Sequence, residues 1–151
     1  MPAGRRWIVI GSLLAGLAVA TGAFAAHGIY DVFERQYRNA EPRQVNGEML
    51  PLAQKYLRDF KTAAEYQMYH GLAILAIGLL ALQRPCRTLD AAAICFLLGT
   101  ILFSGSLYLL TLTNVRILGA IVPMGGVLFL AGWGLLAGAA WKGDDASGSV
   151  P

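Results

Sequence analysis

The stretch ILGAIVPMGGVLFLAGWGLLAGAAW, from Ile117 to Trp141, contains no charged residue. A helix needs about 20 mainly apolar residues to cross the hydrocarbon core of a bilayer. Lipid offers no hydrogen bonds to the peptide groups of such a stretch, so these groups must bond within the segment, as they do in a helix. The stretch therefore predicts a membrane-spanning helix, and this prediction can be extended to the rest of the chain.

Three further stretches are mainly apolar, at residues 7–26, 66–83 and 89–113, and Asp90 at the edge of the last is their one charged residue. The whole chain of 151 residues is 56% hydrophobic and only 14% charged. Soluble domains usually carry about 25% charged residues. These features predict an all-α membrane protein with four transmembrane helices, in which residues 1–151 form a single integral membrane domain.

The longest polar segment lies between the first two spans, and residues 30–65 are expected to form an extramembrane loop. Asp31 and Glu34 have the spacing of a capping box, which predicts a short helix. From Pro51 onward apolar residues recur every three or four positions, so we expect an amphipathic helix over residues 51–65. This helix is predicted to lie on the membrane surface or across the mouth of the bundle, either as a lid or anchor or as a docking surface for a partner.

Basic residues beside the spans predict the orientation of the chain. Arg5 and Arg6 directly precede the first span, and Arg84 and Arg87 occupy the short turn between the second and third spans. Because cytoplasmic segments next to spans are rich in Lys and Arg, both termini are expected in the cytoplasm. The small residues before His27 resemble a signal-peptidase site. The apolar run, however, is longer than the roughly 7–15 residues of a signal-peptide core, so we expect this helix to be retained.

Small residues predict where the spans meet, because helices in lipid associate by close packing of their backbones. In the last span Pro123 is followed closely by two glycines, which predicts a kink. Unwound backbone of this kind is also tolerated where it lines a transport site. The residues expected to pack or shape the helices are Gly22, Ser104, Gly105, Pro123, Gly125, Gly126, Gly134 and Gly138.

Polar side chains near the ends of the first and second spans form the candidate site. The chain has two histidines, each followed by glycine, and both are expected on the loop side of the membrane. Polar groups near membrane depth are often functional and paired. An imidazole there can bond to a helix end, bind a quinone, lipid headgroup or other small molecule, or ligate a metal or haem. The candidate cluster comprises His27, Gly28, Glu65, Tyr66, Gln67, Tyr69 and His70.

No pattern in the sequence is typical of catalysis or of a cofactor site. It shows no nucleophile beside a base, no acid–base pair within the spans and no phosphate-binding loop, so we predict no catalytic residues and no enzymatic activity. Two histidines fall short of the four ligands of a structural zinc site, and Cys86 and Cys95 lack a metal-binding spacing. We therefore predict no metal, no cofactor and two free thiols. The net charge of +3 is scattered along the chain, which argues against a nucleic-acid partner.

Four motifs resemble those of a known family. They are GAFAAHG at residues 22–28, YQMYHGLAIL at 66–75, LFSGSLYLLTLT at 102–113 and ILGAIVPMGGVLFLAGWGLLA at 117–137. In this order they are similar to the YgdD-like family of small inner-membrane proteins, whose function is unknown. The resemblance implies a four-helix, multi-pass protein of the bacterial inner membrane and supplies no catalytic residues. The link between the first two spans is longer here than in that family, roughly over residues 37–48.

These observations favour one function and leave a second one open. The first is a non-enzymatic accessory or structural subunit of a membrane complex, with the lipid bilayer and other membrane-protein subunits as partners. The alternative is a small binding or transport module for a quinone, a lipid or another small amphiphile, at the end of the bundle that carries His27 and His70.

Overall fold

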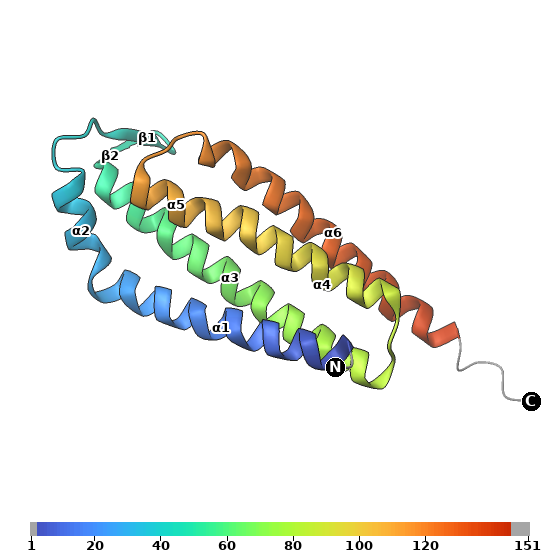
Figure 1. Cartoon of the computed structure of the whole chain (residues 1–151). Coiled ribbons are helices and arrows are strands. Elements are labelled where there is room, and N and C mark those ends of the chain that lie inside the picture. The colour runs from blue at the N-terminus through green and yellow to red at the C-terminus, as the bar shows by residue number, and fades with distance from the viewer. Residues whose placement is uncertain (1–2, 146–151) are drawn as a thin grey trace, which may run out of the picture.

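Four long helical runs lie side by side and alternate in direction, as Figure 1 shows for the computed structural model, which describes residues 3–145. Each run is long and apolar enough to cross a membrane. The predicted class, an all-α membrane protein with four spans, is therefore confirmed. The helices are α1 (Ala3–His27), α2 (Ile29–Gln36), α3 (Leu52–Gln83), α4 (Arg87–Thr100), α5 (Ser106–Thr113) and α6 (Leu118–Asp145).

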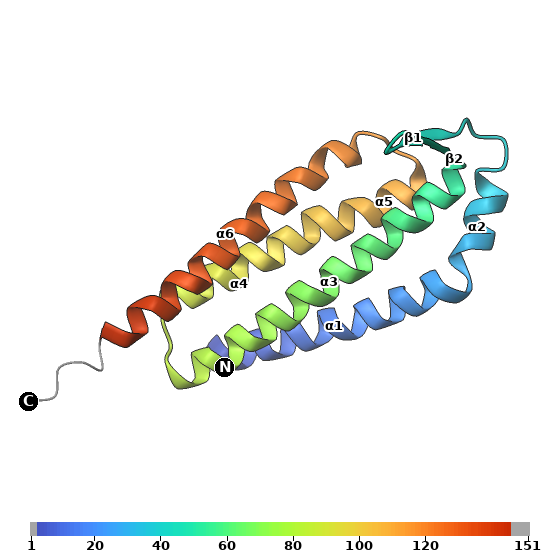
Figure 2. The same cartoon turned by 180° about the vertical axis from the view of Figure 1, so that it is seen from behind.

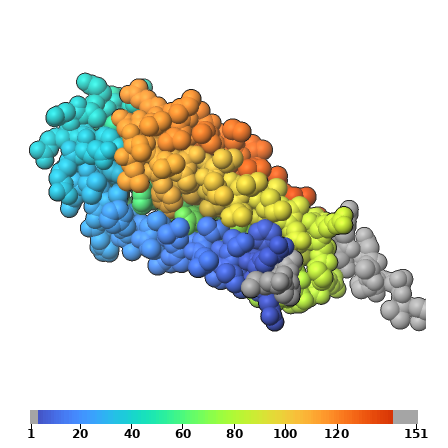
Figure 3. Space-filling view, in the orientation of Figure 1, coloured from blue at the N-terminus to red at the C-terminus, as the bar shows by residue number. Residues whose placement is uncertain are grey.

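The second span differs from the sequence prediction, because the amphipathic helix expected at 51–65 and the span expected at 66–83 form one continuous helix, α3. Neither glycine nor proline interrupts the chain between Leu52 and His70, so nothing in the sequence ends the helix there. The buried face also continues without a break, from Tyr56 and Phe60 to Ile74. The amphipathic segment therefore extends the bundle instead of lying flat on the membrane surface. In Figure 3, α3 is visible as small patches between α1 and the α4–α5 rod.

The third span contains a short irregularity that the sequence did not predict. A π-helical segment, η1 (Ile101–Gly105), joins α4 to α5, and the backbone on both sides of it stays right-handed. Such segments insert an extra residue into a helical turn and often occur at functional sites. Thr100 donates its hydroxyl to the carbonyl of Phe96, as hydroxyls in membrane helices commonly do. The Ser104 hydroxyl is buried without a hydrogen-bond partner in the described part of the chain.

A small unit, called the cap below, consists of α2 and a β-hairpin and covers one end of the bundle (Figures 1 and 2). Strands β1 (Arg43–Val45) and β2 (Glu48–Leu50) pair in an antiparallel manner. Asn46 and Gly47, which connect them, have φ angles of 50° and 89°. A two-residue turn with positive φ at both positions is the favoured hairpin connection, and Asn-Gly is its preferred sequence.

Helix α2 confirms the short helix expected after residue 30, but its N-terminus differs from the predicted capping box. The N-cap is Gly28, which makes no side-chain hydrogen bond to the helix, and Asp31 lies inside the first turn. Asp31 can therefore interact favourably with the helix dipole, but it does not cap the helix.

An aromatic cluster holds the cap on the bundle. Phe33, Tyr37, Tyr56 and Phe60 are each at most 7% exposed, and their rings meet mainly edge to face. The Tyr37 hydroxyl donates to the carbonyl of Thr111 at 2.8 Å. Burial raises the pKa of Tyr37, and nearby Tyr56 raises it further, so the phenol stays protonated as a donor. The cap thus satisfies one of the carbonyl groups that the end of α5 leaves without a helical partner.

Glycines bring α1 and α3 into backbone contact. A Cβ on Gly11 would lie 2.5 Å from the Leu75 nitrogen and 2.6 Å from the Gly71 oxygen. At the next contact, a Cβ on Gly4 would lie 2.7 Å from the Gly78 oxygen. Within each helix the two glycines are seven positions apart, so they lie on one face. These contacts place the start of α1 beside the end of α3, opposite the cap.

The residues predicted to pack helices fall into two groups. A Cβ on Gly125 would lie 2.6 Å from the Phe103 nitrogen, so this glycine sits at the contact between α6 and the third span. At the other predicted glycines, an added Cβ would meet no neighbouring atom of the described chain within 4 Å, so the described residues show no close packing against these positions. These open positions are Gly22, Gly105, Gly126, Gly134 and Gly138. Pro123 lies inside α6, and the helix continues through it.

Candidate functional site

The two histidines of the predicted cluster are well separated in the structure. His27 is exposed and ends α1 next to the cap, whereas His70 is 4% exposed and lies well inside α3. Gly71, the neighbour of His70, contacts Ala15 of α1, which precedes His27 by twelve residues. At about 1.5 Å per helical residue, this separates the two levels by about 18 Å along α1. The two histidines therefore lie at different levels of the bundle and do not form one site.

The predicted residues on α3 point in different directions. Tyr66, Tyr69 and His70 line a hollow on the side of the bundle, whereas Glu65 is exposed and is not part of that lining. Gln67 is buried on another face of the helix. The sequence cluster is thus divided, and three of its members share one surface feature.

That feature, called the groove below, lies between α3 and α6 and has a volume of about 670 Å³. Ligand sites for small molecules commonly occupy about 300–1,000 Å³. Aromatic side chains from α3, α6 and the π-helical segment form most of its wall. The lining residues are Tyr66, Tyr69, His70, Phe103, Pro123, Gly126, Val127, Phe129, Leu130 and Trp133.

Ring stacking fixes the wall of the groove. The His70 and Phe129 rings are parallel, with centroids 3.4 Å apart and an interplanar angle of 5°. The Tyr66 ring stacks on Phe103 at 4.6 Å with an angle of 20°. Because Phe103 belongs to the π-helical segment, the irregular turn in the third span contributes directly to the wall. Trp133 lies further along α6, where its ring meets Phe96 edge to face.

The His70 ring is held by its backbone as well as by stacking. Its Nδ1 lies 2.8 Å from the carbonyl oxygen of Tyr66, one turn earlier in α3. The other ring nitrogen, Nε2, has no hydrogen-bond partner within residues 3–145 and is not sealed from the molecular surface. His70 therefore presents one free nitrogen in an aromatic groove.

Gln67 belongs to a polar chain that the sequence analysis did not identify. Its amide nitrogen donates to the carbonyl of Leu14 at 2.9 Å, and its oxygen accepts from the Tyr108 hydroxyl at 3.1 Å. The Tyr108 hydroxyl in turn lies 3.0 Å from the Thr21 hydroxyl. Polar groups buried between membrane helices require such partners. Gln67 thus links α1, α3 and α5 and serves the structure of the bundle, away from the groove.

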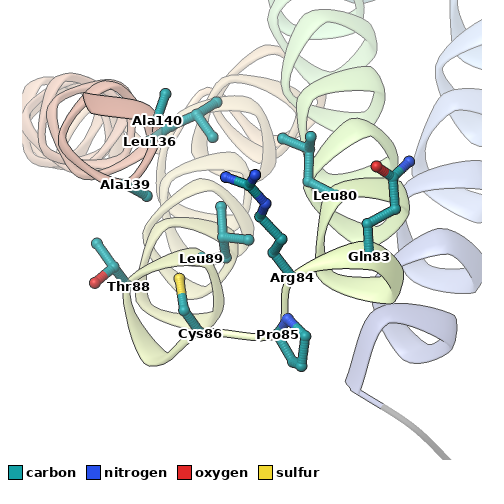
Figure 4. Close-up of a pocket in the computed structure, with 10 residues that line it drawn as sticks. All are labelled: Leu80, Gln83, Arg84, Pro85, Cys86, Thr88, Leu89, Leu136, Ala139 and Ala140. Carbon is teal, nitrogen blue, oxygen red and sulfur yellow. The ribbon is translucent and has the colours of Figure 1, made fainter. Parts of the chain in front are cut away.

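A second hollow, of about 520 Å³, lies at the opposite end of the bundle from the cap (Figure 4). Leu80, Leu89 and Leu136 form part of its apolar wall, and Arg84 and Cys86 lie at its rim. Figure 4 shows the Arg84 side chain extending between α3 and α6. This hollow contains none of the residues that the sequence singled out as a site.

The structure also bears on metal binding and thiol chemistry. Among the described residues, no group of three or more His, Cys, Asp or Glu side chains comes close enough together to hold a metal ion. Cys86 and Cys95 are both free cysteines, as predicted.

The groove contains apolar rings, phenols and one imidazole, which are groups suited to binding a flat, mainly apolar molecule.

Four apolar spanning helices with a lateral groove define a multi-pass membrane protein. Residues 21–126 match the model of a family described as a protein of unknown function, DUF423. The chain belongs to this family. The broader expectation of a small membrane family of unknown function is thus confirmed, although under a different family name from the one that the motifs suggested.

Curated relatives match nearly the full length of the chain. The UPF0382 membrane protein of Staphylococcus epidermidis is 43% identical over 136 residues, which cover 90% of this chain and 95% of that protein. The UPF0382 membrane protein SSP2132 of Staphylococcus saprophyticus is 42% identical over 130 residues, covering 86% and 92%. The UPF0382 membrane protein YwdK of Bacillus subtilis is 36% identical over 137 residues, covering 90% and 96%. No solved structure matches the chain.

Proposed function

We propose that this membrane protein binds a small amphiphile with a flat ring, which enters the groove sideways from the bilayer. The observation that carries the proposal is the aromatic wall around His70, with its free Nε2. Stacked rings offer a flat ligand contact area on their faces, and aromatic pairs add about 0.5–1.5 kcal/mol beyond simple burial. We infer binding without catalysis, because the groove lining contains no second ionisable side chain that could act as an acid–base partner of the imidazole, apart from the phenols.

The position of the groove also suits an amphiphile. Tyr66 directly follows Glu65, the last charged residue of α3, and Tyr69 lies one turn beyond it, where tyrosines commonly sit at the membrane interface. Leu130 and Trp133 lie further toward the opposite end, because α6 runs away from the cap. A polar ring would therefore occupy the level of His70, while an apolar tail would follow α6 into the hydrocarbon.

Filling the groove should abolish binding. Gly126 lines the groove with nothing within 4 Å of an added Cβ, so Gly126→Leu places a branched side chain there without a clash at its Cβ. We expect the affinity for a short-tailed benzoquinone or its hydroquinone to fall at least about tenfold. The measurement is saturable quenching of Trp133 emission in lipid nanodiscs. Of the three tryptophans, Trp7 and Trp141 are replaced by phenylalanine, so that Trp133 alone remains to emit.

Gly134→Leu provides a matched control. Gly134 is on the same helix, has the same open space around an added Cβ and does not line the groove. It should leave the quenching curve unchanged. Equal loss in both variants, or purely linear quenching by partition into lipid in the unmutated groove, would contradict the proposal.

A second function, an accessory subunit of a membrane complex, is favoured by the outer face of α6. Gly134 and Gly138 are four positions apart, exposed and free of contacts within the described chain. Small residues at this spacing commonly let another membrane helix approach closely. Trp133, Leu130 and Val127 add a broad apolar surface around this face. These residues support a partner helix packed against α6.

The subunit hypothesis predicts a stoichiometric partner that depends on this face. Gly134→Leu with Gly138→Leu should remove that partner from protein purified in mild detergent, because the side chains keep the helices apart. Gly16→Leu, at an open position on α1, should retain the partner. Native mass spectrometry measures the composition of each sample. Recovery of the unmutated protein alone, as a monomer or homo-oligomer, would count against this function.

We also propose that both termini face the cytoplasm and that the protein is a multi-pass protein of the bacterial inner membrane. The support is that Arg5, Arg6, Arg84 and Arg87 belong to the same end of the bundle, opposite the cap. Clustered basic residues next to spans favour the cytoplasmic side.

A further inference from the structure

The hydrogen bond of His70 determines which of its nitrogens carries a hydrogen. The carbonyl oxygen of Tyr66 can only accept a hydrogen bond, so Nδ1 at 2.8 Å must be the donor. An uncharged imidazole has one N–H group, and here that group is on Nδ1. Nε2 is then left with a lone pair and can only accept.

The surroundings of the ring preserve this arrangement. Phe129 stacks on one face with an interplanar angle of 5°, and Phe96 lies 5.3 Å away, centroid to centroid. Rotating the ring by 180° would break the bond to Tyr66 and would carry Nε2 away from its present position. The groove lining includes no carboxylate that could pair with a charged imidazolium, and an unpaired charge among apolar rings is costly. The groove therefore presents a fixed acceptor.

We infer that the groove selects ligands that donate a hydrogen bond, namely ring hydroxyls of the phenol or hydroquinone class, over ligands that offer only a carbonyl. This inference rests on the proposed binding function and specifies the ligand for the same groove. The Tyr66 and Tyr69 hydroxyls can either donate or accept, so they do not discriminate between the two classes. His70, which is 4% exposed, does discriminate, because a carbonyl placed beside Nε2 would leave two acceptors facing each other without a hydrogen.

Three probes with the same ring and tail test the inference: a short-tailed hydroquinone, its dimethyl ether and the corresponding quinone. We expect the hydroquinone to bind about tenfold more tightly than the other two, since one hydrogen bond accounts for up to about that ratio. In His70→Phe, which keeps a flat ring but lacks Nε2, all three probes should bind alike. His27→Gln is the matched control and should keep the preference, because His27 is outside the groove. Binding is measured in nanodiscs under reducing conditions for the hydroquinone.

A second measurement does not depend on the His70→Phe variant folding. Nitrogen NMR of ¹⁵N-histidine-labelled protein in the His27→Gln background reports on His70 alone, since the chain has two histidines. We expect a protonated signal for Nδ1 and an unprotonated one for Nε2, with the Nε2 signal shifting when hydroquinone is added. A hydrogen on Nε2, or quinone binding as tight as that of hydroquinone, would overturn the ligand class and leave the groove as a binding site. If none of the three probes binds saturably, the proposed function itself is wrong.

Discussion

Phe33→Ala is expected to lower the free energy of unfolding by about 3–5 kcal/mol, the range typical of a fully buried phenylalanine. Phe33 has no exposed surface, and its ring lies between 6.0 and 6.3 Å from the rings of Tyr37, Tyr56 and Phe60. Because this cluster attaches the cap to the bundle, the cavity should also loosen the cap. The measurements are titration with SDS followed by circular dichroism, and limited proteolysis of the link between α2 and β1.

Val32→Ala is the control for this prediction. Val32 is adjacent in α2 but 36% exposed, and it lies outside the aromatic cluster, so its loss should change stability by no more than about 0.5 kcal/mol. Similar losses in both variants would indicate that α2 is weakened as a helix and that the cluster does not hold the cap.

Gly11→Ala should cost about 3 kcal/mol, at the upper end of the range for overpacking. The added methyl group would lie 2.5 Å from the Leu75 nitrogen and 2.6 Å from the Gly71 oxygen. Both obstacles are backbone atoms, which cannot rotate away, so α1 and α3 must separate along their length. The free energy of unfolding in detergent, obtained from the same SDS titration, measures the cost.

Gly16→Ala separates this clash from the general effect of replacing glycine in a helix. No neighbouring atom of the described chain lies within 4 Å of an added Cβ at Gly16 on the same helix. Alanine is the better helix former by about 0.5–1 kcal/mol, so this variant should be unchanged or slightly more stable. A destabilised Gly16→Ala, or a Gly11→Ala as stable as the original protein, would argue against backbone contact between α1 and α3.

The spans could be predicted because each is a long apolar run with at most one charged residue, Asp90, at its edge, and lipid allows few ways to satisfy its backbone. The sequence predicts the end of a helix less reliably than it predicts a span. The change from polar to apolar sequence near Tyr66 reflects a change of surroundings, from water to lipid, and α3 passes through it without a break. The hairpin was not predicted from the sequence, although Asn46 and Gly47 are the preferred pair for a two-residue turn.

The contacts between helices show that the spacing expected between small residues decides which glycines are predicted to pack. Gly134 and Gly138 are four positions apart, a spacing typical of helix contacts in membranes, but an added Cβ at either would meet no neighbouring atom of the described chain within 4 Å. The close contacts instead follow a spacing of seven, and Ala18 and Ala25 continue the row of Gly4 and Gly11 at 3% exposure each. A period of seven keeps one narrow face of a helix against its neighbour, and this row could have been found in the sequence.

The groove was only partly accessible from the sequence. Tyr66, Tyr69 and His70 drew notice because polar groups near membrane depth are often functional and paired. Their partners Phe103, Phe129 and Trp133 are typical lipid-facing or core residues, and only the packing of α6 and the π-helical turn brings them together. The sequence grouped His70 with His27 because the second span was predicted to begin at residue 66. In the structure residue 66 lies inside the longer helix α3, which begins at Leu52, so His70 is far from the end of its helix.

The unbroken course of α3 has a mechanical consequence. Its 32 residues measure about 48 Å, well beyond the roughly 30 Å of hydrocarbon in a bilayer. The protruding part carries Tyr56 and Phe60, on which the cap rests, and the submerged part carries His70. No glycine or proline joint separates them. Because α3 is continuous, we expect a tilt of its protruding part to be transmitted to the wall of the groove, so that binding to the hairpin would change the groove.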